Sequence, residues 1–159
     1  MAIFAKYDGI DGESKDENHD KWIDVLSLDW AMEQPGAGAT GKTRRRARAL
    51  VDDLTLTLEY EKASPKLQEN CLKGKVIPKL EIEQTATYGG ARATYLKYEL
   101  KNVMVSGVQI DAIGNDEAGP PTVVVSNNFE EVKVTYTEFD NDGSVKGNVE
   151  YSWKPKKGS

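Results

Sequence analysis

The stretch LTLTLEYEK, residues 54–62, carries the clearest strand signal in the chain. Leucine and tyrosine occupy the even positions from 54 to 60, and threonine and glutamate occupy the positions between them. This alternation predicts a strand with one buried face and one solvated face. Such a strand is typical of an antiparallel sheet, because an antiparallel sheet can face water on one side.

Similar patterns continue outward on both sides of this stretch. They cover residues 3–10, 21–32, 75–87, 94–110, 129–139 and 144–153, and turn signals occur at Tyr88-Gly89-Gly90 and Asn141-Asp142-Gly143. Many short strands separated by turns predict a barrel or sandwich. The 159 residues fit one domain, 1–159. We therefore expect a mainly β fold, a small antiparallel β-barrel made of two packed sheets.

Two strand patterns have irregular parity. Residues 96, 98 and 100 share one parity, whereas Val103 and Val105 share the other, and this shift predicts a bulge. In the segment 21–32, Ser27 and Asp29 have the parity of the apolar Ile23 and Val25. The apolar character of that parity therefore stops at Ser27, which predicts a polar surface at the end of this strand.

Only residues 64–74 have the pattern of a helix. Ser64 is expected to cap it, Pro65 suits the first position, and Gly74 suits the position just after the end. Leu67 and Cys71 lie one turn apart, so they are expected to form its buried face. We interpret Cys71 as a small core residue and not as a nucleophile.

Residues 33–50 are expected to form a long extended loop that contains a known short motif. The segment Gly36-Ala-Gly-Ala-Thr-Gly41-Lys42-Thr43 matches the phosphate-loop pattern G-x-x-x-x-G-K-[ST]. A phosphate loop joins a buried parallel strand to a helix whose N-terminus binds the phosphate. Here Pro35 precedes the loop and a strand follows almost at once. A phosphate-loop nucleotide-binding protein is thus the less favoured alternative.

The same loop concentrates positive charge on an acidic chain. The net charge is −5, from 21 basic and 26 acidic residues, and the loop holds five of the basic ones: Lys42, Arg44, Arg45, Arg46 and Arg48. This asymmetry indicates docking onto a negative surface. A nucleic-acid-binding module is a second alternative, although no aromatic residues lie among the arginines to stack on bases. We favour a protein contact with an acidic face near residues 11–20 or near Glu130 and Glu131.

The sequence offers little for catalysis. It contains one histidine, His19, and one cysteine, so a catalytic triad could use only His19. This histidine lies in an acidic, polar stretch and is expected to be a solvated loop residue. A metal site rich in soft ligands is nearly excluded. We therefore predict no enzyme activity, no catalytic or metal-binding residues and no cofactor.

A series of short motifs runs in order along almost the whole chain. These are Gly12-Glu13-Ser14, His19, Ile23-Asp24-Val25, Trp30, the glycine-rich loop, Ser64-Pro65-Lys66-Leu67 with Cys71 and Gly74, Val103-x-Val105-Ser106, and the closing hairpin of residues 129–153. The series resembles the haemolysin-coregulated protein family, the tube subunit of bacterial type VI secretion. One departure is the basic run at residues 42–48, where family members are richer in glycine and small polar residues.

The resemblance implies six-fold rings that stack into a hollow tube, which a contractile sheath expels from the cell. The implied partners are the protein itself, the sheath and tip proteins, and small effector proteins carried in the lumen, with no nucleic acid and no membrane. Ser27 and Asp29 are candidates for the lumen face. Contacts between subunits or rings are expected from the loop residues Gly36, Gly38, Gly41, Lys42, Arg44, Arg45, Arg46 and Arg48.

The N-terminal segment bears on localisation. It lacks the basic segment, apolar stretch and cleavage site of a secretory signal, and no apolar run in the chain approaches the length of a membrane span. Together with the resemblance, this predicts a protein that resides in the bacterial cytoplasm before the machine fires. It is then secreted without a signal peptide.

Overall fold

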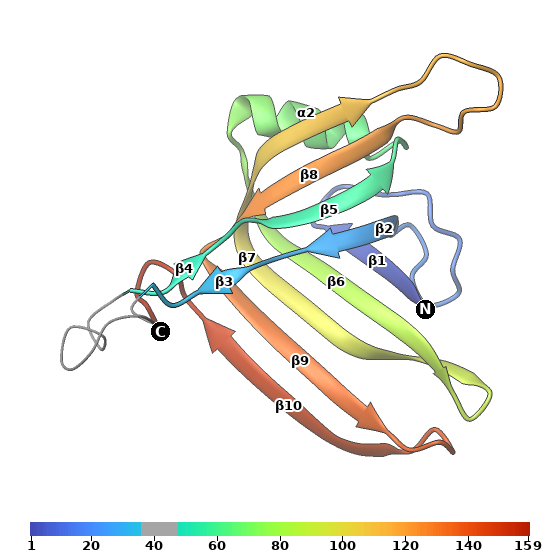
Figure 1. Cartoon of the computed structure of the whole chain (residues 1–159), viewed down its shortest axis with the longest axis vertical. Coiled ribbons are helices and arrows are strands. Elements are labelled where there is room, and N and C mark those ends of the chain that lie inside the picture. The colour runs from blue at the N-terminus through green and yellow to red at the C-terminus, as the bar shows by residue number, and fades with distance from the viewer. Residues whose placement is uncertain (36–47) are drawn as a thin grey trace.

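The computed structural model describes residues 1–35 and 48–159, and the statements below concern that part of the chain. It contains ten strands and a helix (Figure 1). Their order is β1 (Ala2–Tyr7), β2 (Ile23–Asp29), β3 (Met32–Glu33), β4 (Leu50–Val51), β5 (Leu54–Glu59), α2 (Ser64–Lys73), β6 (Val76–Tyr88), β7 (Ala91–Asp111), β8 (Thr122–Asn128), β9 (Glu131–Phe139) and β10 (Val145–Trp153).

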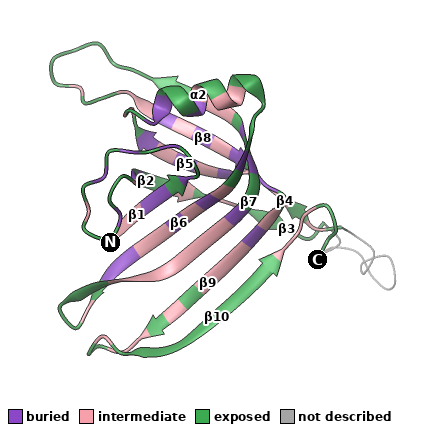
Figure 2. Cartoon of the chain, turned by 180° about the vertical axis from the view of Figure 1, so that it is seen from behind, coloured by how far each residue is buried: buried purple, intermediate pink, exposed green. Residues whose placement is uncertain are grey.

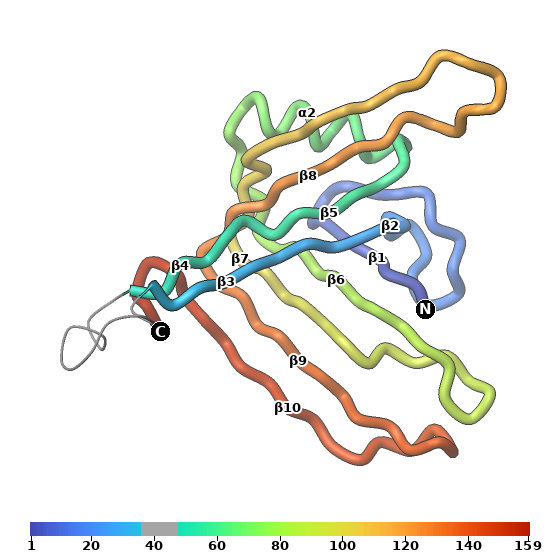
Figure 3. The backbone as a smooth tube through the Cα atoms, viewed as in Figure 1, coloured from blue at the N-terminus to red at the C-terminus, as the bar shows by residue number. Residues whose placement is uncertain are grey.

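Eight of the strands form one antiparallel sheet that closes on itself. Its order is β10-β9-β7-β6-β1-β2-β5-β8, and an additional pairing of β7 with β8 closes the last six into a barrel. Strands β9 and β10 remain outside the barrel and extend away from it as a flange (Figure 3). The predicted mainly β barrel with one short helix is therefore confirmed.

Strand β7 belongs to both parts of the sheet because it is 21 residues long. Its first half pairs with β9 in the flange, and its second half pairs with β8 in the barrel. The predicted parity shift is present, since Leu100 and Val103 are both buried. Between them Asn102 has a left-handed backbone with φ 52°, and the register with β8 slips after Val105. The strand thus bends where it passes from flange to barrel.

A second irregularity lies in β2. Its register with β5 slips between Val25 and Ser27, so that the next residue packed against the core is Leu28. Ser27 and Asp29 consequently lie on the exposed surface, although they share the parity of the buried Ile23 and Val25. The alternation of buried and exposed residues in β2 therefore changes parity at the bulge.

The barrel interior holds the core (Figure 2). The alternating leucines 54, 56 and 58 of β5 are fully buried there, as the sequence predicts. On α2, Leu67 is buried and Cys71 packs against the core. Gly74, with φ 61°, ends the helix in a left-handed conformation that glycine adopts readily. The predicted Ser64 cap is wrong: Ala63 occupies that position, and the Ser64 hydroxyl accepts a hydrogen bond from the Glu61 amide.

Over the described ranges, no helix has the length and apolarity needed to cross a membrane.

Candidate functional site

The base of the predicted loop is a two-stranded arm. Strand β3 pairs with β4 through Met32 with Val51 and Glu33 with Leu50, and the arm projects from one end of the barrel (Figure 1). The Trp30 indole N–H donates to the Asp52 carbonyl over 2.9 Å, which fixes the arm to the start of β5. Arg48 is exposed on the arm. The other loop residues named above, Gly36, Gly38, Gly41, Lys42, Arg44, Arg45 and Arg46, lie outside the described residues.

The arm also bears on the phosphate-loop motif. A phosphate loop needs a parallel strand before it and a helix after it. Here the described flanks are the two paired strands of an antiparallel ribbon, and the strands β4 and β5 follow within residues 48–59 without a helix. Every strand pair in the described part of the chain is antiparallel. The flanks therefore differ from the strand–loop–helix context that phosphate binding requires.

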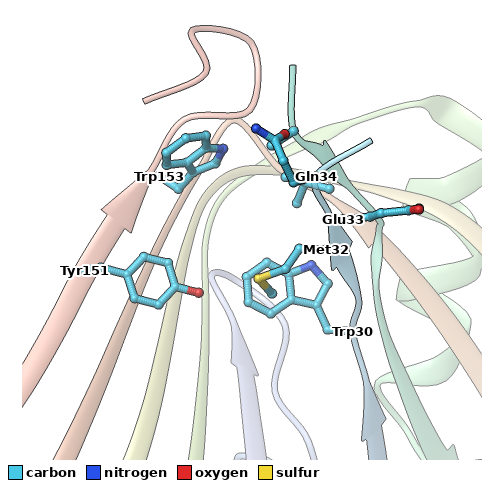
Figure 4. A pocket seen from close by; sticks show the side chains of 8 residues that line it. Trp30, Met32, Glu33, Gln34, Tyr151 and Trp153 are labelled. Atoms are coloured by element: carbon cyan, nitrogen blue, oxygen red, sulfur yellow. The ribbon is translucent and has the colours of Figure 1, made fainter. Parts of the chain in front are cut away.

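An apolar groove of about 310 Å³ lies between the arm and the end of β10. Trp30 and Met32 come from the arm side, and Tyr151 and Trp153 face them from β10 (Figure 4). The sequence did not predict this groove, because its two walls are about 120 residues apart in the chain. The only local signal is that Tyr151 and Trp153 are two residues apart on β10 and therefore share one face of that strand.

Ser27 and Asp29, the candidate lumen residues, lie on the outer surface of the barrel. They pair with Thr57 and Thr55 of β5. These four neighbours form a polar strip across two adjacent strands. The strip suits a solvated surface.

His19 contradicts the prediction of a solvated loop histidine. It is buried, its ring stacks on Phe4 with centroids 4.2 Å apart, and its edge meets Trp22. Nδ1 lies 2.7 Å from the Asp16 carboxylate and Nε2 lies 2.9 Å from the Glu83 carboxylate. The prediction failed because the wall formed by β1 and β6 supplies an aromatic face and an acid to this loop.

The His19 cluster is suited to a structural role and not to proton transfer. Both ring nitrogens are occupied by carboxylates, so neither is free to accept a proton from a nucleophile. Asp16 also forms an ion pair with Arg92, and Glu83 accepts a hydrogen bond from Thr94. The cluster therefore joins the loop between β1 and β2 to the hairpin of β6 and β7.

Metal chemistry finds no support in the described ranges. Within residues 1–35 and 48–159, no group of three or more histidine, cysteine, aspartate or glutamate side chains is arranged to hold a metal ion. Cys71 packs against the core from α2.

Comparison with known proteins assigns the chain to a family. Residues 4–136 match the family model described as "Type VI secretion system effector, Hcp". Protein hcp1 of Pseudomonas aeruginosa is 33% identical over 154 residues, which cover 96% of this chain and 94% of that protein.

Solved structures agree with this match. A structure described as a type six secretion system protein has a TM-score of 0.89 at 26% identity and covers 100% of this chain and 98% of its own. Hcp1 from Salmonella typhimurium has a TM-score of 0.75 at 28% identity, with 98% and 95% covered. A closed barrel with a flange and a loop arm is thus the fold of bacterial secretion-tube proteins. The chain belongs to the Hcp family of type VI secretion, as its sequence motifs indicated.

Proposed function

We propose that this protein is a non-enzymatic structural subunit whose six-membered rings stack into an exported tube. The observation that carries the proposal is the family match over residues 4–136. The shape of the subunit supports it, because the β3–β4 arm lies at one end of the molecule and the tight turns at residues 88–91 and 139–145 lie at the other (Figure 1). Two different ends suit head-to-tail contacts, which close rings or propagate filaments.

Electron microscopy of the purified protein tests this function directly. The expected particles are rings with a central hole and six-fold symmetry, and stacks of such rings at high concentration. Particles without a central hole would contradict the proposal. In the cell, the same account expects the protein in the culture medium only when the contractile machine is intact.

The basic segment at residues 42–48 would dock onto an acidic face of a neighbouring subunit or ring. The two faces named from the sequence are partly neutralised within the chain: Asp16 pairs with Arg92, and Glu131 lies 3.9 Å from Lys101. Glu13 of the first face lines one groove together with Asp24 and Glu59, and none of these three forms an ion pair with the described residues. Their groove is therefore the better docking face.

A charge-removal variant tests this contact. Replacing Arg44, Arg45, Arg46 and Arg48 by serine should leave rings intact and weaken their stacking at low salt. The wild-type protein should lose the same contact at high salt, because surface ion pairs are screened. Stacking that is equal in both proteins at both salt concentrations would exclude the basic segment as a ring contact.

Ser27 and Asp29 would line the lumen, where small effector proteins travel. A Ser27→Cys variant in a Cys71→Ser background tests their position. In assembled rings, a small maleimide should still label residue 27, whereas a maleimide on a protein too large for the lumen should not. Equal labelling by both reagents would place Ser27 on the outside of the ring.

A further inference from the structure

The flange has an apolar face that continues outward from the core of the barrel. Leu100 pairs with Val132, and Val132 with Trp153, and the first two are buried members of the core. The next row along the same face is Tyr98, Val134 and Tyr151. The row after it is Leu96, Tyr136 and Val149. Tyr98 and Val134 of the second row pack against the core, whereas the third row is not part of it. We call these last two rows the flange face.

The flange face is exposed although it is apolar. Val149 is 74% exposed, Tyr136 46% and Tyr151 45%. Tyr151 also lines the groove beside the arm, where Met32 is 53% exposed. These four side chains present roughly 400–500 Å² of surface, before the partly exposed Trp30 and Trp153 are counted. A continuous patch of this size matches the largest patches found on monomeric proteins, and those are often functional.

The opposite face of the same strands is of a different kind. There Lys97, Thr135 and Glu150 stand in one row, and Glu99, Lys133 and Ser152 in the next. Lys133 lies 3.5 Å from Glu150, and Lys97 lies 3.6 Å from Glu99. The flange is therefore a sheet with one charged, solvated face and one apolar face.

The edge of the flange is open as well. Strand β10 is the last strand of the eight-stranded sheet, whereas the far end of that sheet is closed by the pairing of β7 with β8. Lys146 and the register irregularity after Val145 protect the start of this edge, whereas residues 148–153 carry one charged side chain, Glu150, and neither lysine nor proline. A covering molecule would thus meet an apolar face and an unpaired strand together.

A second apolar surface lies across the barrel from the flange. Leu72, near the end of α2, is 89% exposed. Val76 and Met104 are register partners on β6 and β7, and both are exposed. Helix α2 packs against β7, and it lies on the opposite side of the barrel from β10 in both views (Figures 1 and 2). We call Leu72, Val76 and Met104 the helix-side patch.

We propose that the flange face of each subunit is covered by the helix-side patch of a second copy of this chain. The inference rests on the proposed ring, and it names the two surfaces that meet within it. Two unlike surfaces on opposite sides of a subunit form a heterologous contact, which can close a ring. A flange face pairing with itself would instead give a two-fold dimer.

Two single variants test the pairing, Val149→Glu on the flange face and Leu72→Glu on the helix-side patch. Each should abolish ring formation and leave a monomer by light scattering, because it buries an unpaired charge in the contact. Mixed in equal amounts, the two should form a complex of two subunits and no larger species. In that complex the intact flange face of one variant meets the intact helix-side patch of the other.

Asn148→Glu is the matched control, since residue 148 is the neighbour of Val149 on β10 and points to the solvated face. This control should assemble as the wild type does. If Val149→Glu assembled as the wild type does, the role of the flange face would be overturned. If Leu72→Glu did so, the role of the helix-side patch would be overturned. A mixture that remains monomeric, or Val149→Glu in a two-subunit species by itself, would also overturn the pairing. By contrast, a wild-type protein that never assembles would refute the proposed ring itself.

Discussion

The Tyr7 hydroxyl donates a 2.6 Å hydrogen bond to Oδ1 of Asn127, and both side chains are fully buried although they are 120 positions apart in the chain. The Asn127 amide in turn donates to the Leu54 carbonyl over 3.0 Å. Burial raises the pKa of Tyr7, so the hydroxyl stays protonated as a donor. One polar network thus links β1, β5 and β8 inside the barrel.

Loss of Asn127 should be costly for the stability of the fold. Asn127→Ala leaves the Tyr7 hydroxyl unpaired and removes the side-chain donor to the Leu54 carbonyl, so we expect a loss of about 2–4 kcal/mol in the free energy of unfolding. Tyr7→Phe leaves only the asparagine oxygen unpaired and should cost about 1–2 kcal/mol. Urea unfolding at one protein concentration measures both. If the double variant loses the full sum of the two, the network does not act as a unit.

The His19 cluster should also contribute to stability. His19→Leu removes the two ring nitrogens that contact Asp16 and Glu83 and leaves both carboxylates facing an apolar side chain, although Arg92 and Thr94 still contact them. We expect a loss of about 1–3 kcal/mol. Asp20→Asn, an exposed change in the same loop, should stay within about 0.5 kcal/mol of the wild type. Equal unfolding midpoints for His19→Leu and the wild type would contradict the structural role.

Replacing Glu61 by glutamine should stabilise the fold, and the gain should depend on pH. Burial, together with the nearby carboxylates Glu13 and Asp24, raises the pKa of Glu61, and its Oε1 has no hydrogen-bond partner within the described residues. An acid with a raised pKa in the folded state favours the fold when protonated, and this contribution is lost as the pH rises through the raised pKa. Glu61→Gln should therefore raise the melting temperature by about 1–2 °C at pH 7–8 and leave it unchanged near pH 3.

The exposed Glu59 supplies the control for this effect. Glu59→Gln should give the same melting temperature as the wild type at both pH values. A Glu61→Gln protein that is less stable at pH 7 would show that the ionised carboxylate is needed by its neighbours.

The phosphate-loop motif should not bind nucleotide. Titration of the protein with ATP and magnesium in a calorimeter should release no binding heat, and Lys42→Ala should behave identically. The physical reason is that the described flanks supply a ribbon of two strands and not a strand followed by a helix. Saturable binding that Lys42→Ala abolishes would restore the nucleotide-binding alternative.

The sequence predicted what depends on local pattern. The alternation at residues 54–60 is sufficient to place three leucines in the core, and Gly74 is sufficient to mark the end of the helix. The slip in β2 could not be predicted, because a bulge depends on the partner strand β5. His19 was misplaced for a related reason, since its partners Phe4 and Glu83 come from distant strands.

The surfaces were the hardest part to predict. The flange face becomes apparent only once the registers of β7, β9 and β10 are known, because its rows combine residues from three strands. The groove beside the arm could not be predicted either, because its walls bring together Trp30 and Tyr151, which are distant in the sequence. The sequence motifs indicated the family and, through it, a ring-shaped assembly. The structure was needed to suggest which surfaces of the subunit would meet in that ring.

The mass of the purified protein in solution tests the central claim most directly. Size-exclusion chromatography with light scattering should give a mass near six subunits. A mass of one subunit at every concentration, for a protein shown to be folded by circular dichroism, would contradict the ring-forming tube subunit proposed here.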